Sequence, residues 1–437
     1  MPTLEGIVFV PLAIYYFFKR PDLLFPLLII SAVFQASSIV SSGPIGLQPY
    51  YVVALLFISR FLLQSWTAPI AFAAVRTPIR VLILFGLVAF ASAFILPVVF
   101  GGTPVYDPKN GIDAGYLQQA PLHLQVGNFA QAAFLIINIL VVIAAGKQVG
   151  NVDKTHQALT YALYITVFFV FIQFACFELG INFPAFLLNN NPGYGVVNLT
   201  ETQIRPNGSF TEPSMAGAAL ACFAGAYLAM YIVGKSSIKR GALAVLACLL
   251  VGSTSSLLAV VMLVFCLLAA HPIIRWSGHI DLKRVRRLAL FFAAAIVCAA
   301  IFFIPSIQEM LISQTLGKGG TWSALVRLGA DAYAATLTLE TYGLGVGLGG
   351  NRPSSFVMSL LSQVGILGLA LFVYATASAL IGLPKEHRWI GWAGFSLFLA
   401  MSMGVPDLSF PFVWAMIGLA VQSKAASTAP PEELQSI

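Results

Sequence analysis

The sequence predicts an all-α polytopic membrane protein. Only 9% of the 437 residues are charged, whereas an ordinary soluble domain carries about 25%. The mean hydropathy is +0.89 and 59% of the residues are hydrophobic, so a soluble fold would have too few polar side chains to cover its surface. The composition therefore excludes a soluble enzyme, an intrinsically disordered chain and a disulfide-stapled scaffold.

Apolar runs of about 17 to 25 residues mark the expected membrane spans. In chain order they cover residues 3–18, 23–40, 50–66, 81–100, 128–146, 158–179, 214–234, 288–306, 355–382, 390–403 and 410–422. A further stretch, 242–270, is longer and is interrupted by Gly252 and four hydroxyl residues. We expect a helical hairpin there, because the basic loops on both sides of it should lie on the same face of the membrane.

The basic residues predict the orientation of the chain. Most of the 23 Lys and Arg residues fall in one alternating set of loops, which we assign to the cytoplasm because cytoplasmic loops are enriched in these residues. The result is about 12 to 13 transmembrane helices with an outer N-terminus and a cytoplasmic C-terminus. The net charge of +7 is scattered over many short loops, so no nucleic-acid partner is expected. Five basic residues remain in the outer loops: Lys109, Arg205, Lys318, Arg327 and Arg352.

The expected organisation is a single integral membrane domain over residues 1–422, followed by a short, polar, disordered cytoplasmic tail over 423–437. The inner loops are short. Long loops without a function are uncommon, which draws attention to the three long outer loops, 101–127, 180–213 and 307–354.

Arg205, Arg327 and Arg352 all lie in these outer loops, beside Gly-rich or Pro-rich turns. Guanidinium groups bind phosphates bidentately, and Gly-rich turns let backbone N–H groups approach an anion. The pattern predicts a clamp for a pyrophosphate. The alternative is that each arginine extends to lipid headgroups or pairs with an outer carboxylate such as Asp331 or Glu340. Further candidates for substrate binding lie beside the arginines: Asn207, Gly208, Ser323, Gly345, Gly347 and Ser354.

Glu212 lies seven residues after Arg205, where the next span begins. Its carboxylate is a candidate general base, or simply a favourable anion at a helix N-terminus. The sequence has no HExxH motif and no Cys/His cluster, so neither a metal site nor another cofactor is predicted.

Several motifs together resemble the O-antigen ligase and polymerase superfamily. They are, in order, Arg205-Pro-Asn-Gly-Ser-Phe-Thr-Glu-Pro213, Arg327, Gly343-Leu-Gly-Val-Gly-Leu-Gly349 and Ser359-Leu-Leu-Ser-Gln-Val-Gly-Ile-Leu-Gly368. The resemblance covers roughly residues 120–385. It implies a GT-C-like helical bundle with long periplasmic loops in the bacterial inner membrane.

The activity implied by the resemblance is that of a metal-independent inverting glycosyltransferase whose donor is an undecaprenyl-diphosphate-linked glycan. Arg205 and Arg327 occupy the positions expected to bind the donor diphosphate. Many members carry Ser-Arg where this chain has Ser253-Thr254-Ser255-Ser256. The ligases place a histidine where this chain has Ser354. The arginine of that turn is therefore missing here, and the loss of the ligase histidine favours a polymerase of O-antigen or exopolysaccharide repeat units.

Two alternatives remain at this stage. An O-antigen ligase would transfer the same glycan to lipid A core, and a flippase or other transporter would move it across the membrane. The middles of the spans hold few ionisable groups, which argues against ion-coupled transport. The candidate partners are the lipid-linked glycan and membrane lipid, with a chain-length regulator and a flippase as candidate protein partners.

Overall fold

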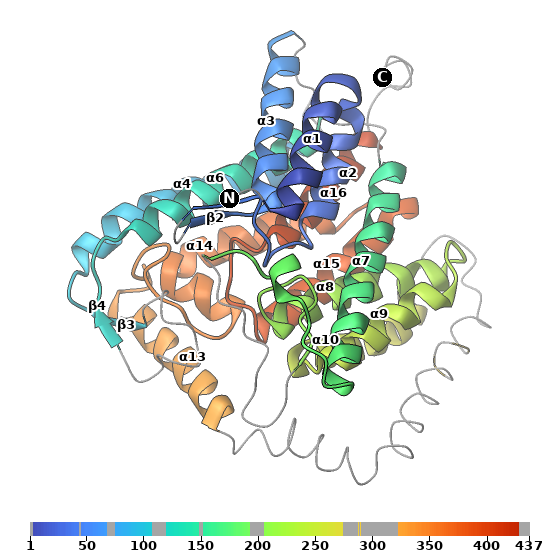
Figure 1. The fold of residues 1–437 in the computed structure, drawn as a ribbon. Helices are drawn as coiled ribbons and strands as arrows, with labels where there is room; N and C mark the ends of the chain where they lie inside the picture. The colour runs from blue at the N-terminus through green and yellow to red at the C-terminus, as the bar shows by residue number, and fades with distance from the viewer. Residues whose placement is uncertain are drawn as a thin grey trace.

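The computed structural model describes residues 3–42, 45–67, 75–106, 119–147, 152–192, 205–273, 287, 289 and 322–427. These residues form a bundle of helices with two short antiparallel hairpins (Figure 1). The hairpins pair β1 (Val40–Ser42) with β2 (Ile45–Leu47) and β3 (Pro104–Tyr106) with β4 (Gln119–Pro121). The helices are α1 (Leu4–Lys19), η1 (Pro21–Leu23), α2 (Leu24–Ser31), α3 (Pro49–Thr67), α4 (Arg76–Val99), α6 (Val126–Ala145), α7 (Val152–Glu178), η3 (Ala185–Leu187), α8 (Pro213–Ile232), α9 (Ile238–Val251), α10 (Thr254–Ile273), α13 (Trp322–Glu340), α14 (Phe356–Leu380), η6 (Lys385–His387), α15 (Arg388–Ser402) and α16 (Pro411–Ala426).

Within the described residues, five helices are long and apolar enough to cross a membrane: α4, α6, α7, α8 and α14. Shorter apolar helices cover Pro21–Ser31, Pro49–Gln64 and Thr254–Leu268. The protein is therefore an all-α membrane protein, as the composition predicts. The expected span 288–306 lies outside the described residues, and the total of about 12 to 13 helices stays a prediction.

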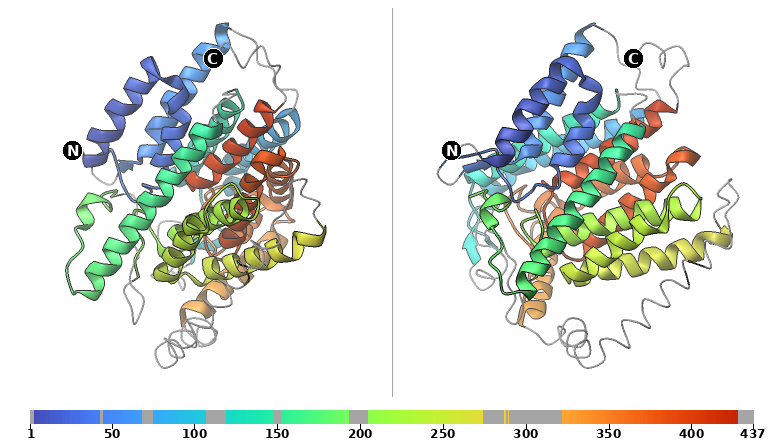
Figure 2. Two further views of the ribbon diagram at one scale, coloured as in Figure 1. Left: turned by 90° about the vertical axis from the view of Figure 1, so that its right-hand side faces the viewer. Right: turned by 45° about the vertical axis from the view of Figure 1, so that its right-hand side comes forward.

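Helix α8 forms the centre of the bundle, where it contacts α7, α9, α10 and α15. Figure 2 shows these surrounding helices from two further directions. The apolar stretch of α8 is completely buried and is rich in Ala and Gly. Small residues let membrane helices approach closely; a Cβ at Gly225 would lie 2.6 Å from the backbone oxygen of Trp392 in α15. This packing fixes the start of α8, where Glu212 lies.

The predicted hairpin at 242–270 is confirmed. Helix α9 ends at Gly252, which adopts the left-handed conformation (φ 63°) that glycine reaches without a Cβ penalty. Helix α10 then begins at Thr254.

The expected span 23–40 is not one helix, because α2 ends at Ser31. The chain after Ser31 contains Gln35, Ser37 and Ser38, and its polar groups bond to a distant loop instead of continuing the helix. The Ser37 hydroxyl donates to the backbone oxygen of Leu188 (2.7 Å), and the Ala36 amide donates to the backbone oxygen of Ser209 (3.0 Å). This irregular segment supports the loop that begins at Arg205.

The predicted tail boundary at residue 423 is also wrong, since α16 continues to Ala426. The Ser423 side chain is buried and bonds to the His387 ring (2.9 Å). Lys424 Nζ donates to the backbone oxygens of Ser378 and Ile381 at the end of α14. A cation at a helix C-terminus is favourable, and these contacts stabilise the last turn of α16.

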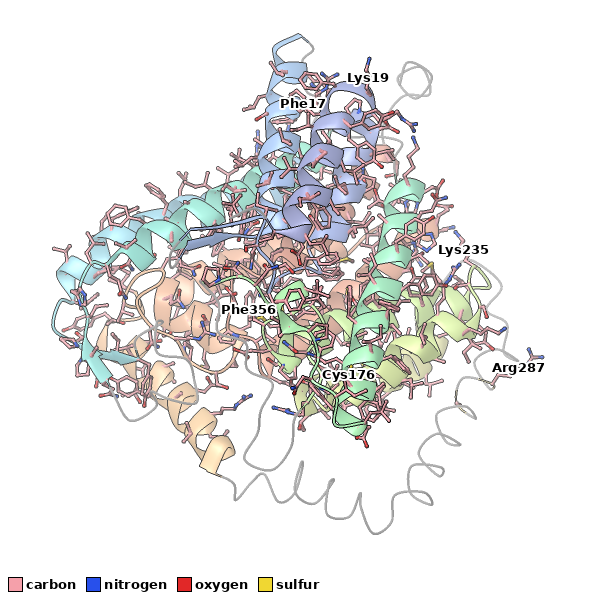
Figure 3. The ribbon with its side chains drawn as sticks, viewed as in Figure 1. Phe17, Lys19, Cys176, Lys235, Arg287 and Phe356 are labelled. Carbon is pink, nitrogen blue, oxygen red and sulfur yellow. The ribbon has the colours of Figure 1, made fainter. Side chains whose placement is uncertain are left out.

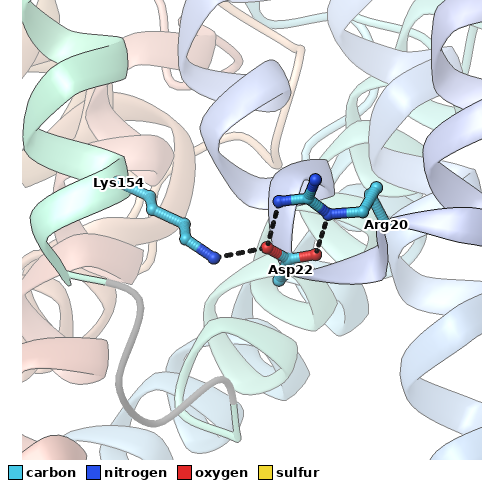
Figure 4. Close-up of polar contacts among 3 residues, drawn as sticks. All are labelled: Arg20, Asp22 and Lys154. Carbon is cyan, nitrogen blue, oxygen red and sulfur yellow. Dashed lines mark hydrogen bonds and ion pairs between the residues drawn. The ribbon is translucent and has the colours of Figure 1, made fainter. Parts of the chain in front are cut away.

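Loops assigned to the cytoplasm contact one another at one end of the bundle, which we call the basic end. Lys154 Nζ lies 2.5 Å from Asp22 Oδ2, and Arg20 Nε lies 3.4 Å from Asp22 Oδ1 (Figure 4). Lys235 Nζ donates to the backbone oxygen of Glu386 (3.4 Å). In Figure 3, Lys19 lies at the top and Lys235 and Arg287 lie at the right-hand side of the molecule, whereas Cys176, near the other end of α7, lies in the lower middle of the view. The grouping follows the charge pattern; which side of the membrane the basic end faces stays a prediction.

Candidate anion-binding site

The loop before α8 is held by a buried glutamine of α7. Gln173 Oε1 accepts hydrogen bonds from the backbone amides of Asn207 (2.7 Å) and Gly208 (2.8 Å), and its Nε2 donates to Asn207 Oδ1 (2.9 Å). Asn207 is fully buried, and its Nδ2 donates to the backbone oxygen of Phe210. Asn207 and Gly208 therefore shape the loop, and these contacts give them a supporting role instead of an exposed, substrate-facing one.

The supported loop carries Arg205 to the turn between α9 and α10. Arg205 Nη1 donates to the backbone oxygen of Gly252 (3.2 Å). Beyond this turn, Ser253 Oγ lies 3.1 Å from the hydroxyl oxygens of both Ser255 and Ser256. The turn between α9 and α10 thus receives an arginine from another loop. Arg205 supplies positive charge beside this turn.

Glu212 and Arg352 form an ion pair between two loops that are distant in the sequence. Arg352 Nη2 lies 3.6 Å from Glu212 Oε1, and the Ser214 hydroxyl donates to Glu212 Oε2 (3.0 Å). Glu212 is the N-cap residue of α8, so its carboxylate also lies at the positive end of the helix dipole. The side chains of Arg352 and Glu212 are 30% and 19% exposed, which leaves the pair accessible to a soluble anion.

Asp331 joins α13 to the start of α14. Its Oδ1 accepts hydrogen bonds from the backbone amides of Ser354 (2.8 Å) and Ser355 (3.1 Å). Residues four apart lie on the same face of a helix, so Arg327 shares the face of α13 that carries Asp331. This contact places the Arg327 face of α13 toward the segment that holds Arg352.

Arg352 is fixed in the chain by its neighbour Asn351. The Asn351 side chain accepts from the Tyr106 amide (3.1 Å) and donates to Ser362 Oγ (3.1 Å). Gln363 Nε2 donates to the Asn351 backbone oxygen (2.7 Å), and the Arg352 amide donates to the Tyr106 backbone oxygen (3.2 Å). These bonds tie Arg352 to α14 and to the β3 strand.

Two of the arginines have a buried hydrogen-bond donor that the fold leaves unused. Nε of Arg327 and Nε of Arg352 are buried and have no hydrogen-bond partner among the described residues. A buried guanidinium donor without an acceptor is costly. An oxyanion that reaches these side chains would supply the missing acceptor.

The prediction that Gly345 and Gly347 present backbone amides to an anion needs correction. Their amides bond within the protein, Gly345 to Thr341 Oγ1 (3.0 Å) and Gly347 to the Gln363 backbone oxygen (2.9 Å). The glycines allow close packing instead: a Cβ at Gly345 would lie 2.7 Å from the Ser362 backbone oxygen.

The Gly-rich segment fills a break in α14. Helix α14 is interrupted at Gly365 (φ 72°), where carbonyl and amide groups lose their helical partners. The Val346 amide donates to the Ser362 oxygen (2.8 Å) and the Ile366 amide donates to the Gly343 oxygen (2.9 Å). The glycines therefore shape the scaffold on which Arg352 is mounted.

The remaining predicted residues have different outcomes. Ser354 is buried, with its amide bonded to Asp331 as described. Ser323 lies in the first turn of α13, but its side chain lies outside the described part of the chain. Within the described residues, no group of three or more His, Cys, Asp or Glu side chains is placed to hold a metal ion.

Sequence reasoning missed Gln173, Asn351 and Gln363 as supporting residues. Gln173 was visible as one of the few polar residues within an apolar span, but nothing in the sequence names its partner. A scan against models of protein families and a search of curated proteins found no match to this chain.

Proposed function

We propose that the protein polymerises undecaprenyl-diphosphate-linked oligosaccharide repeat units into O-antigen or exopolysaccharide on the periplasmic face of the bacterial inner membrane. The observation that carries this proposal is the arrangement of Arg205, Arg327 and Arg352. Each is mounted on a separate loop or helix, with contacts through Gly252, Glu212 and Asp331. Helix α8 runs from its N-cap residue Glu212 to Ile232, close to Lys235 of the basic end, which supports a site at the opposite end of the bundle. Such an arrangement suits a lipid-linked diphosphate, whose tail lies in the bilayer and whose head lies at its rim.

In the proposed reaction, a hydroxyl oxygen of the acceptor sugar attacks the anomeric carbon of the donor from the side opposite the diphosphate. The new C–O bond forms as the bond to the diphosphate breaks, and the leaving diphosphate keeps the electron pair. Preorganised guanidinium groups stabilise the charge that develops there, without a metal. Glu212 is the candidate acceptor for the hydroxyl proton.

The polymerase assignment is preferred to ligase and transporter for two reasons. The position at which ligases carry a histidine is Ser354, a buried serine without an imidazole. The centre of the bundle is the Ala-rich α8, completely buried over its apolar stretch, which gives no support to a polar path for a glycan. A chain-length regulator remains a candidate partner.

Reconstitution in liposomes distinguishes these functions. Purified protein is supplied with one defined lipid-linked repeat unit, and the products are separated by size. Growth to longer lipid-linked chains is the expected result. Transfer to added lipid A core would favour the ligase, and translocation without chain growth would favour the transporter.

A further inference from the structure

The ion pair between Glu212 and Arg352 is loose. The distance of 3.6 Å between Glu212 Oε1 and Arg352 Nη2 exceeds the 2.7–3.2 Å typical of an N–H···O hydrogen bond. Partly exposed ion pairs of this kind contribute little to stability. Breaking this contact to admit a better acceptor is therefore inexpensive.

Glu212 does not depend on Arg352 for its position. Its other carboxylate oxygen accepts from the Ser214 hydroxyl, and the N-terminus of α8 stabilises its charge. Arg352, in contrast, has its Nε buried without a hydrogen-bond partner among the described residues. In this pair, Glu212 is held by Ser214 and the N-terminus of α8, whereas Nε of Arg352 still lacks an acceptor among the described residues.

We infer that the Glu212 carboxylate is a competing anion, which occupies Arg352 until a diphosphate displaces it. A diphosphate offers several oxygens to one guanidinium and can engage it bidentately, which the 3.6 Å contact with Glu212 does not achieve. Glu212 then sets the affinity of the site for diphosphates. This inference rests on the proposed function, because it takes the diphosphate of the lipid-linked glycan as the incoming anion.

The test is pyrophosphate binding by the full-length protein in detergent micelles, measured by equilibrium dialysis with radiolabelled pyrophosphate. In Glu212→Gln the competitor is removed, and we expect binding about 2- to 5-fold tighter, the range that corresponds to a partly exposed ion pair. Glu340→Gln is the matched control, since it removes one exposed negative charge from α13 without touching the pair. It should leave the affinity unchanged.

A double-variant comparison isolates the interaction. Glu212→Gln combined with Arg352→Ala should bind no more tightly than Arg352→Ala alone. If Glu212→Gln does not fold, Glu212→Ser provides a neutral residue that caps helices well, and it should show the same tightening.

The outcomes separate this inference from the proposed function. If the wild type binds pyrophosphate but neutral residues at position 212 bind it no better, the competing role of Glu212 is wrong and the anion site stands. The same conclusion follows if Glu340→Gln tightens binding equally, or if the tightening persists without Arg352. Failure of the wild type to bind pyrophosphate would overturn the inference and remove the main support for the proposed function.

Discussion

Replacing Gln173 by leucine is expected to weaken both the fold and the anion site. Gln173 is 1% exposed, and it bonds to the Asn207 amide, the Gly208 amide and Asn207 Oδ1. Leucine keeps a similar volume but leaves two backbone donors and one side-chain acceptor without partners. Each buried unsatisfied group costs about 1–3 kcal/mol, and partial relaxation of the loop brings the expected total to about 3–6 kcal/mol.

The loop that loses these bonds carries Arg205, so pyrophosphate affinity should fall together with stability. Thermal unfolding in detergent measures the first effect and equilibrium dialysis below the unfolding temperature measures the second. Gln422→Leu is the control: Gln422 is also buried and accepts from Thr155 Oγ1 (3.1 Å), but it lies in α16 beside the basic end. It should lose stability and keep pyrophosphate affinity. A Gln173→Leu variant that unfolds and binds like the wild type would refute the supporting role of Gln173.

Three further predictions concern the scaffold. Gly347→Ala should destabilise the protein by about 2–4 kcal/mol, because Gly347 has φ 98° and an added Cβ would lie 2.7 Å from the Ser92 backbone oxygen. Gly102→Ala is the control: Gly102 has φ 87° but open space around an added Cβ, so the variant should lose less stability. Equal melting temperatures of the two variants would contradict the packing argument. Asp331→Ala should cost about 1–3 kcal/mol, because the amides of Ser354 and Ser355 lose their acceptor, and an unchanged unfolding temperature would argue against this contribution. Burial raises the pKa of Asp22, but hydrogen bonds from Lys154 and Arg20 outweigh burial and hold the pKa below its ordinary value. The stability that Asp22 contributes is therefore fully present above about pH 3.9, the pKa of the unfolded chain. It is lost as the pH falls through the lower pKa of the folded protein. In Asp22→Asn, the free energy of unfolding should depend less on pH over that acidic range. A pH dependence identical to that of the wild type would exclude a contribution of Asp22 to stability.

The helices were largely predictable because the bilayer imposes their length and composition. The hairpin that turns at Gly252 followed from charge alone, since two basic flanks require an even number of crossings. The end of α2 at Ser31 was not predictable. Hydropathy registers Gln35, Ser37 and Ser38 as minor interruptions, whereas in the structure Ser37 and Ser38 bond to Leu188 and Asn190, which are distant in the sequence.

The sequence singles out the arginines of the candidate site, which stay a prediction, but not the contacts that hold them. An outer arginine departs from the positive-inside pattern and is noticeable in any sequence. That Arg352 pairs with Glu212 instead of Asp331 or Glu340 depends on how the segments that precede α8 and α14 approach each other, which residue spacing does not encode. The prediction that the Gly-rich segment presents backbone amides to an anion was wrong for a physical reason. Glycine is required both where backbone amides approach an anion and where a backbone packs against a broken helix.

The central claim is that the outer arginines bind a diphosphate during glycan transfer, and chain growth from a single lipid-linked repeat unit in proteoliposomes tests it most directly. Arg327→Ala and Arg352→Ala should insert normally and slow chain growth on the order of 10²-fold. Arg60→Ala is the matched control: Arg60 lies in α3, is partly buried and likewise has a buried Nε without a partner among the described residues, and the variant should keep the wild-type rate. Wild-type chain growth in both outer variants would contradict the account.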